Sequence, residues 1–265
     1  MDQNGRITPE NLSKVISHRT KIVSLAHVGN VLGHDINIKD IANIVHKNNA
    51  IFIVDGAQSV PHQKTDFKDW GIDFLAFSAH KMCGPTGVGC LIGKYDLLKD
   101  MDSPFEGGGT NITFNKQCEV YDSLPPAKFE AGTLNLSGII GFKAAIDFIN
   151  EIGIDNIHQH DIELTRYAIE EMKKLDNVIV YNQNSFNGIV SFNVKGVFAQ
   201  DEATLLNSKG IAVRSGQHCA KMLNEFLDTP ATCRASFYLY TSKEDVDALI
   251  NALKEGGDIL DAYFS

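Results

Sequence analysis

Short apolar segments alternate with amphipathic segments over the first hundred residues of the chain. Four of the short segments have the length and composition of strands, at residues 21–25, 51–54, 74–77 and 89–92. Residues 38–48 lie between the first two and carry Ile41, Ile44 and Val45 at helical spacing. This alternation predicts an α/β fold with a mainly parallel sheet that is covered on both faces.

The pattern changes after about residue 137. Helices are predicted at 137–151, 155–175, 201–208 and from Ser242 onward, and strands at 178–181, 188–194 and 233–238. This order predicts a smaller α+β C-terminal domain packed on the first one. We place the boundary within 137–155, which divides the chain into residues 1–145 and 146–265. A ligand pocket is then expected at the domain interface.

Composition and charge exclude several classes of partner. The 265 residues carry a formal net charge of −9, which argues against nucleic acid or an anionic membrane as the main partner. No apolar run approaches the ~18 residues of a membrane span. The five cysteines are odd in number and none forms a CxxC pair, so neither a disulfide framework nor a zinc site is expected. We therefore expect reduced thiols and a cytoplasmic protein.

A lysine stands directly before a glycine-rich loop in the stretch FSAHKMCGPTGVG, residues 77–89. Taken alone, Lys81 is as well explained by an incidental place in a tight turn as by a functional role. Asp55, which follows the strand 51–54, is likewise explained as a cap of the next helix. The carboxyl ends of parallel strands share one edge of the sheet, so Asp55 and Lys81 are expected to lie close together. A desolvated lysine forms an imine with the aldehyde of pyridoxal phosphate, and a carboxylate keeps the ring nitrogen protonated. Ser78 and His80 then supply a hydroxyl for the phosphate and a further polar contact.

A second cluster lies in the stretch GIAVRSGQHCAK, residues 210–221. Cys219 follows His218 and lies near Arg214, an electropositive setting that favours an exposed, reactive thiol. The alternative of a buried structural cysteine fits Cys90 and Cys118 better. Arg234, at the start of a predicted strand, is explained either as a solvated edge charge or as a bidentate clamp for a carboxylate.

Taken together, these stretches resemble the cysteine desulfurases of the class V aminotransferase group, within the fold-type I pyridoxal phosphate enzymes. The particular likeness is to the SUF-type branch that includes selenocysteine lyases. The matching stretches, in family order, are HVGNVLG (27–33), VDGAQSVPH (54–62), DFLAFSAHKMCGPTGVG (73–89), EGGG (106–109), KFEAGTLN (128–135), GIAVRSGQHCA (210–220) and CRASFYLY (233–240). The resemblance implies the large domain of a pyridoxal phosphate transferase, here incomplete, followed by a small domain.

For the cofactor, the resemblance implies that Lys81 holds pyridoxal 5'-phosphate covalently and then moves protons. Asp55 pairs with the pyridinium nitrogen and Gln58 contacts the ring hydroxyl. The phosphate is bound by Ser78, by His80 and by Thr133 from the partner subunit of a homodimer.

For the substrate, the resemblance implies that Asn30 and Arg234 hold the amino acid, Arg234 by its carboxylate, and that Arg214 supports the pocket mouth. Cys219 attacks the sulfur of L-cysteine and keeps it as a persulfide while L-alanine leaves. A sulfur-acceptor protein of iron–sulfur cluster assembly is the implied partner.

The sequence departs from the family pattern in several places. Gln217 stands where a histidine of the cysteine loop is usual, Leu134 where proline is usual, and Thr241 where asparagine is usual. Family members also carry well over a hundred residues before the point that matches the start of this chain. Those residues include a phosphate-binding turn and a histidine that stacks on the cofactor. Residues 1–265 alone are therefore expected to bind the cofactor poorly and to turn over cysteine negligibly.

Three alternatives remain open at this point. Within the same class, the chain is a selenocysteine lyase acting on L-selenocysteine, or another class V lyase of the kynureninase type. In a different class, it is a non-catalytic module that has kept its surfaces and lost its activity. A metal site formed by Cys219, His218 and His27 is the weakest alternative, because no ligand spacing supports it.

Overall fold

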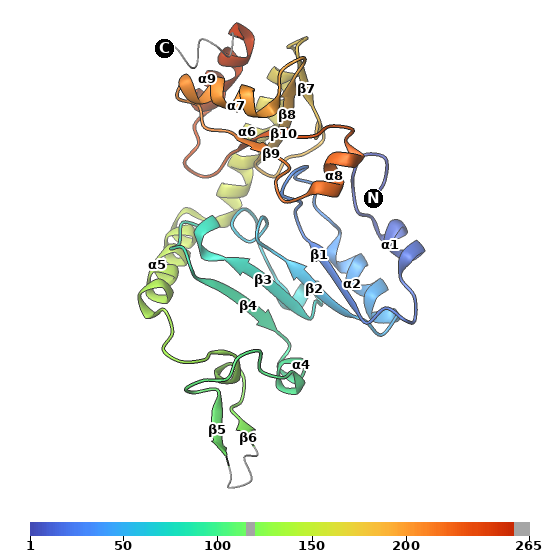
Figure 1. The fold of residues 1–265 in the computed structure, drawn as a ribbon, viewed down its shortest axis with the longest axis vertical. Helices are drawn as coiled ribbons and strands as arrows, with labels where there is room; N and C mark the ends of the chain where they lie inside the picture. The colour runs from blue at the N-terminus through green and yellow to red at the C-terminus, as the bar shows by residue number, and fades with distance from the viewer. Residues whose placement is uncertain (115–119, 257–265) are drawn as a thin grey trace.

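The computed structural model describes residues 1–114 and 120–256, and two four-stranded sheets dominate them (Figure 1). The first sheet contains, in spatial order, β1 (Ile22–Ala26), β2 (Ile51–Asp55), β3 (Phe74–Ser78) and β4 (Gly89–Gly93). Strands β1, β2 and β3 are parallel, and β4 runs antiparallel to β3. The predicted α/β fold with a mainly parallel sheet is confirmed.

Helices α1 (Pro9–Val15), α2 (Ile38–Lys47) and α3 (Phe67–Trp70) lie in the same half of the molecule as this first sheet and share its hydrophobic cluster. Helix α2 begins where the side chain of Asn37 accepts a hydrogen bond from the backbone of Asp40, at 3.3 Å. Its buried residues Ile41 and Val45 share one hydrophobic cluster with Phe52 of β2. The helical spacing seen in the sequence thus marks the face that packs on the sheet.

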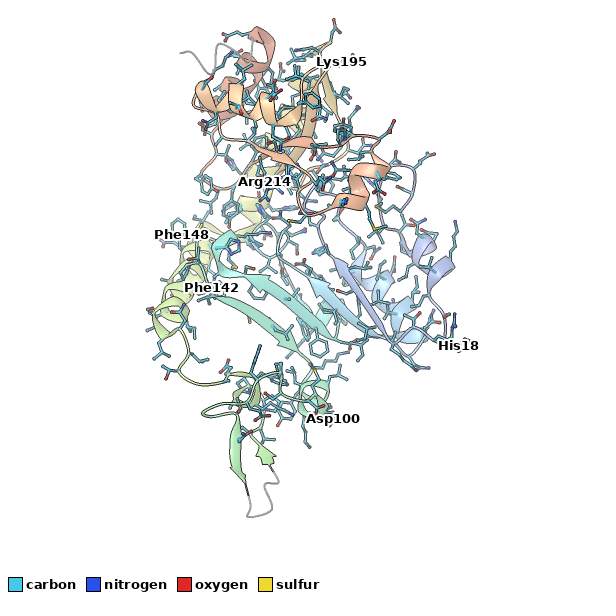
Figure 2. The ribbon with its side chains drawn as sticks, viewed as in Figure 1. His18, Asp100, Phe142, Phe148, Lys195 and Arg214 are labelled. Atoms are coloured by element: carbon cyan, nitrogen blue, oxygen red, sulfur yellow. The ribbon has the colours of Figure 1, made fainter. Side chains whose placement is uncertain are left out.

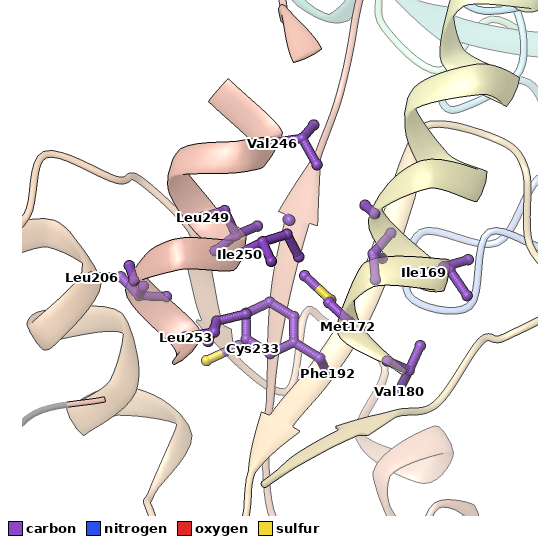
Figure 3. Packing of buried hydrophobic residues seen from close by; sticks show 14 of the residues in the cluster. Ile169, Met172, Val180, Phe192, Leu206, Cys233, Val246, Leu249, Ile250 and Leu253 are labelled. Atoms are coloured by element: carbon purple, nitrogen blue, oxygen red, sulfur yellow. The ribbon is translucent and has the colours of Figure 1, made fainter. Parts of the chain in front are cut away.

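The second sheet is antiparallel throughout and is covered by three helices. Its strands are, in spatial order, β7 (Val178–Val180), β8 (Ile189–Val194), β10 (Thr232–Ser236) and β9 (Arg214–Gly216). The helices are α6 (Ile154–Met172), α7 (Ala199–Ser208) and α9 (Lys243–Glu255). Met172, Phe192 and Ile250 meet in the core between them (Figure 3). The fold of this half agrees with the α+β pattern expected from the sequence.

The remaining elements connect the two sheets or extend from them. They are α4 (Tyr95–Asp100), β5 (Asn111–Phe114), β6 (Val120–Asp122), α5 (Leu136–Ile152), α8 (Lys221–Phe226) and the 3-10 turns η1 (Ala79–Lys81) and η2 (Ala127–Phe129). Helices α5 and α6 are separated by Gly153 alone, in a backbone with φ of 90°. The predicted division between residues 145 and 146 falls within α5 and stays a prediction. In the part of the chain that the structure describes, no helix is both long and apolar enough to cross a bilayer.

Residues 30–33, of sequence NVLG, join the two halves of the molecule. Their backbone carbonyls accept hydrogen bonds from side chains of the second half. The Ser191 hydroxyl donates to the Val31 carbonyl at 2.5 Å, and the Asn187 amide donates to the Gly33 carbonyl at 2.8 Å. The two halves are therefore held together by directional bonds at this segment, which we call the seam.

One expectation about the first sheet is wrong. Cys90, expected to be a buried structural cysteine, is exposed, as is its neighbour Leu91, at 54%. The reason is the position of β4, which pairs only with β3 and so forms one edge of the sheet within the described residues. The buried cysteine is Cys233 on β10, whose pKa is raised to about 12, first of all by burial. Cys118 lies outside the described residues.

Candidate active site

The polar residues predicted to share one edge of the first sheet follow the strand ends there. Asp55 is the last residue of β2 and Ser78 the last of β3, and the turn η1 then carries Lys81. Because β2 and β3 are parallel and Asp55 lies opposite Ala76, these ends meet at one edge. The Asp55 carboxylate accepts a hydrogen bond from the backbone of Ala57 at 2.8 Å, which fixes its orientation.

The Lys81 amine is half-buried among charged groups. Burial is the main cause that lowers its pKa; Asp55 opposes this, and Arg234 and Arg214 lower the pKa further. A lysine with a lowered pKa holds more of its amine in the neutral, nucleophilic form. The same interactions show that residues from both halves of the chain act on one amine.

A pocket of about 290 Å³ opens beside this amine. Its lining includes Gln58, His80 and Lys81 from the first half and Arg234 and Tyr238 from the second. The pocket therefore lies between the two halves, as expected. A larger pocket, of about 670 Å³, includes Gly216 and Gln217 but none of the residues that the sequence predicted for cofactor or substrate.

Two arginines lie side by side at the edge of the second sheet. Arg214 of β9 is the direct cross-strand neighbour of Arg234 of β10, and it lies where the second sheet faces the first (Figure 2). Burial and the charge of Arg214 lower the pKa of Arg234. Its Nη1 donates to the backbone carbonyl of Asn30 at 2.9 Å, while Nε is buried with no hydrogen-bond partner among the described residues. Like charges placed together destabilise a sheet unless an anion joins them, so this arrangement fits an anionic ligand.

The loop that carries Cys219 is held in an uncommon backbone conformation. His218 and Cys219 have φ of 50° and 60°, a region that residues other than glycine rarely adopt. The loop is fixed by hydrogen bonds: the Asn30 amide donates to the His218 carbonyl at 2.7 Å, and His218 Nε2 lies 2.9 Å from the Thr232 carbonyl. The Cys219 thiol is exposed at the end of this arrangement.

His218 is buried beside the exposed Cys219, which the sequence did not indicate. Its ring is buried, at 3% exposure, and burial is the main cause that lowers its pKa. Burial thus disfavours the positively charged form of this histidine. The short side chain of Cys219 stays exposed while the histidine beside it is used to anchor the loop to Thr232.

Most of the predicted site residues come together, but only four of the ten line the pocket: Gln58, His80, Lys81 and Arg234. Asp55, Lys81, Arg214 and Arg234 interact electrostatically, and Asn30 joins Arg234 to the Cys219 loop. Among the described residues that line the pocket, Thr133 and Ser78 do not appear, and Thr133 is exposed.

Six further residues line the pocket without having been assigned a role from the sequence: His62, Cys83, Ser236, Phe237, Tyr238 and Tyr240. Cys83 was visible in the glycine-rich loop, and His62 ends the stretch VDGAQSVPH. The sequence does not show that these residues share a pocket, because Tyr238 comes from the second half of the chain and meets the others only in the folded structure.

The chemistry of these side chains fits pyridoxal phosphate. The group needs an amine for its aldehyde, which Lys81 supplies, and a carboxylate for its ring nitrogen, which Asp55 supplies. An amino-acid substrate adds a carboxylate, for which Arg234 has a buried unpartnered Nε. In the described parts of the chain, no three His, Cys, Asp or Glu side chains are grouped so as to hold a metal ion.

Residues 1–249 match the family Aminotransferase class-V. The chain is 48% identical over 258 residues to a probable cysteine desulfurase of Halalkalibacterium halodurans, covering 96% of this chain and 63% of that protein.

Two solved structures are similar as well. The apo cysteine desulfurase from Thermococcus onnurineus NA1 is 36% identical, with a TM-score of 0.91, and the match covers 96% of this chain and 64% of that one. The cysteine desulfurase CsdA from Escherichia coli is 34% identical, with a TM-score of 0.89, and the match covers 96% of this chain and 62% of that one. The chain thus spans less than two thirds of the length of these relatives. By the family match, which takes in most of its residues, the chain belongs to the class V aminotransferases.

Proposed function

We propose that this protein is a pyridoxal phosphate-dependent cysteine desulfurase, which converts L-cysteine to L-alanine and keeps the sulfur on Cys219. The observation that carries the proposal is the link through Asn30. Its carbonyl accepts from Arg234 at 2.9 Å and its amide donates to the Cys219 loop at 2.7 Å. One residue thus connects the group suited to the substrate carboxylate with the loop that carries the thiol.

The first half of the chain supplies the cofactor residues in this proposal. Lys81 carries the cofactor and later moves the proton at the substrate carbon, a role suited to an amine whose pKa is lowered by burial. Asp55 holds the proton on the ring nitrogen, Gln58 contacts the ring hydroxyl, and Ser78 and His80 bind the phosphate. The cofactor, when bound, supplies the electron sink that allows bonds at the amino acid to break.

The second half supplies substrate binding and the sulfur acceptor. Arg234 binds the carboxylate of cysteine through its guanidinium group, and Arg214 adds positive charge at the mouth of the pocket. The Cys219 thiolate attacks the sulfur of the substrate. A sulfur–sulfur bond forms, the bond between carbon and sulfur breaks with its electrons on the carbon side, and a proton completes alanine. The exposure of Cys219 allows the persulfide to be passed on.

The assembly and the cellular role are also proposals. We propose a homodimer, in which Thr133 reaches the phosphate of the other subunit. Its support is that Thr133 is exposed and precedes an apolar stretch of α5, where Leu136, Ile139 and Ile140 are 60%, 43% and 70% exposed. A sulfur-acceptor protein of iron–sulfur assembly and a cytoplasmic location complete the proposal.

The cofactor assignment is tested by reductive labelling. The protein is extended upstream to the length of its relatives and treated with pyridoxal phosphate and borohydride. Peptide mapping is then expected to find the pyridoxyl group on Lys81. Lys81→Ala should abolish the label, whereas Lys94→Ala, at a lysine paired with Asp73 at 2.6 Å, should keep it. A label that stays at full yield in Lys81→Ala contradicts the proposal.

A further inference from the structure

A fully buried aspartate of α6 meets a histidine of the first half beside the Lys81 pocket. Asp161 Oδ2 lies 2.7 Å from His62 Nδ1, and the two side chains are 0% and 13% exposed. The other oxygen, Asp161 Oδ1, has no hydrogen-bond partner within residues 1–114 and 120–256. A carboxylate buried this deeply is costly unless it is paired. Asp161 therefore depends on His62.

The His62 ring is packed against the second half on two further sides. Its centroid lies 4.7 Å from that of Tyr238, with the rings at 64°. The Tyr238 hydroxyl donates to the carbonyl of Pro61, the neighbour of His62, at 3.0 Å. On another side, a Cβ at Gly188 would lie 3.6 Å from the His62 ring. The imidazole is thus held from α6, from the start of β8 and from the segment after β10.

These contacts join the two walls of the pocket. Gln58 and Lys81 line it from the first half, and Arg234 and Tyr238 from the second. His62 follows Gln58 by four residues, and Tyr238 follows Arg234 by four. A change at the contact between His62 and Tyr238 would therefore move residues that line the pocket on both sides.

We infer that His62, held by Asp161, is a positioning residue that sets the spacing between Arg234 and the cofactor wall of the pocket. The inference rests on the proposed function, because it assigns Arg234 to the substrate carboxylate. His62 acts through Tyr238 and the 58–62 loop and not on the reacting atoms. Its loss is expected to weaken substrate binding more than it slows the chemistry, since small displacements of a binding group are costly.

Two substitutions of His62 separate the hydrogen bond from the ring. His62→Phe keeps a ring against Tyr238 but leaves Asp161 without a donor. His62→Asn keeps a donor near the position of Nδ1 and loses the ring. In the cofactor-loaded protein extended upstream to the length of its relatives, His62→Phe should raise KM for L-cysteine about tenfold with kcat within about twofold. His62→Asn should stay within about threefold of the wild-type KM.

His46 supplies the matched control. Its Nε2 lies 2.9 Å from Asp73 Oδ2, so it belongs to a second histidine–aspartate pair, and it does not line the pocket. Asp73 also pairs with Lys94 at 2.6 Å. His46→Phe is expected to lower stability without changing KM, which separates a loss of pairing in general from a loss of positioning.

A second measurement does not depend on catalysis. Cys83 lines the same pocket and interacts with the Tyr238 hydroxyl, so its alkylation by iodoacetamide reports on that wall. His62→Phe should label Cys83 several-fold faster than the wild type, and His46→Phe should not. Tyr238→Phe removes the bond from the hydroxyl to Pro61 and also its interaction with Cys83, so only its KM is compared. This variant should raise KM for L-cysteine less than His62→Phe does, and it replaces His62→Phe as the test if His62→Phe does not fold.

The outcomes that overturn the inference are specific. One is a folded His62→Phe with unchanged KM and unchanged Cys83 labelling or, if His62→Phe does not fold, a Tyr238→Phe with unchanged KM. The other is a His62→Asn as impaired as His62→Phe, because the hydrogen bond to Asp161 would then not matter. If the proposed function itself is wrong, the wild type forms no alanine, while the rate of Cys83 labelling still decides whether His62 holds the pocket wall.

Discussion

The pKa of His27 depends strongly on the surroundings of its side chain. It directly follows β1, is 7% exposed, and packs edge-on against Trp70 with ring centroids 4.8 Å apart. Its Nδ1 is buried without a hydrogen-bond partner in the described residues. Burial lowers its pKa from 6.5 to about 4, and the nearby Asp35 opposes that change only in part.

This residue should make stability depend on pH in mildly acidic solution. Below pH 6.5 the unfolded chain takes up a proton at His27 that the folded chain does not, so stability falls as pH drops from 6.5 toward 4. The contribution should reach roughly 2–3 kcal/mol near pH 4. His27→Phe keeps a ring against Trp70 and removes the titration. Urea unfolding of both proteins from pH 7.5 to 4.5 checks this, and a difference that stays constant with pH contradicts it.

The residues of the site were predictable to different extents. Asp55, Lys81 and Arg234 were found because strand ends and a glycine-rich loop are visible in sequence. His62 and Asp161 were not, because their pairing joins residues 99 positions apart and neither has a local signal. The burial of His218 was not predictable for a similar reason, since it depends on the partner Thr232 in another strand.

At the scale of elements, the seam shows why the stretch HVGNVLG has its composition. Gly33 has a φ of 62°, and a Cβ there would collide with the Ser185 hydroxyl. That hydroxyl donates back to the Gly33 carbonyl. Only glycine combines this backbone conformation with so close an approach of the second half.

Gly33→Ala should therefore destabilise the protein for two reasons, the backbone conformation and the contact with Ser185. Gly71 is the matched control, because it has a φ of 70° but nothing within 4 Å of a Cβ built on it. Gly71→Ala should cost about 1 kcal/mol, and Gly33→Ala about 1–2 kcal/mol more. Equal losses in the free energy of unfolding, measured in urea, would show that the contact at the seam contributes nothing.

The strand pattern itself was well predicted, and the exposure of individual strands was not. The four apolar segments of the first half form β1 to β4 nearly as expected. The sequence does not distinguish a central strand from an edge strand when both are apolar, so Cys90 on β4 was wrongly expected to be buried. Burial is a property of the sheet order, which depends on contacts between distant segments.

At the scale of the whole molecule, the pocket and the surface have opposite character. The chain has a net charge of −9, yet Lys81 and Arg234 line one pocket. Arg214 and the Asp55 carboxylate both act electrostatically on the Lys81 amine. A positive pocket of this kind favours an anionic ligand such as an amino acid carboxylate or a phosphate. The two halves each supply part of it, so the site exists only where they meet.

The measurement that tests the central claim most directly is the fate of the sulfur. The protein, extended upstream to the length of its relatives, is mixed with pyridoxal phosphate and L-cysteine, thiols are trapped by alkylation, and peptide masses and alanine are determined. We predict a persulfide on Cys219 together with alanine, both lost in Cys219→Ser and both retained in Cys83→Ser. Alanine formed by Cys219→Ser at the wild-type rate, or a persulfide found on Cys83 in place of Cys219, would contradict the account.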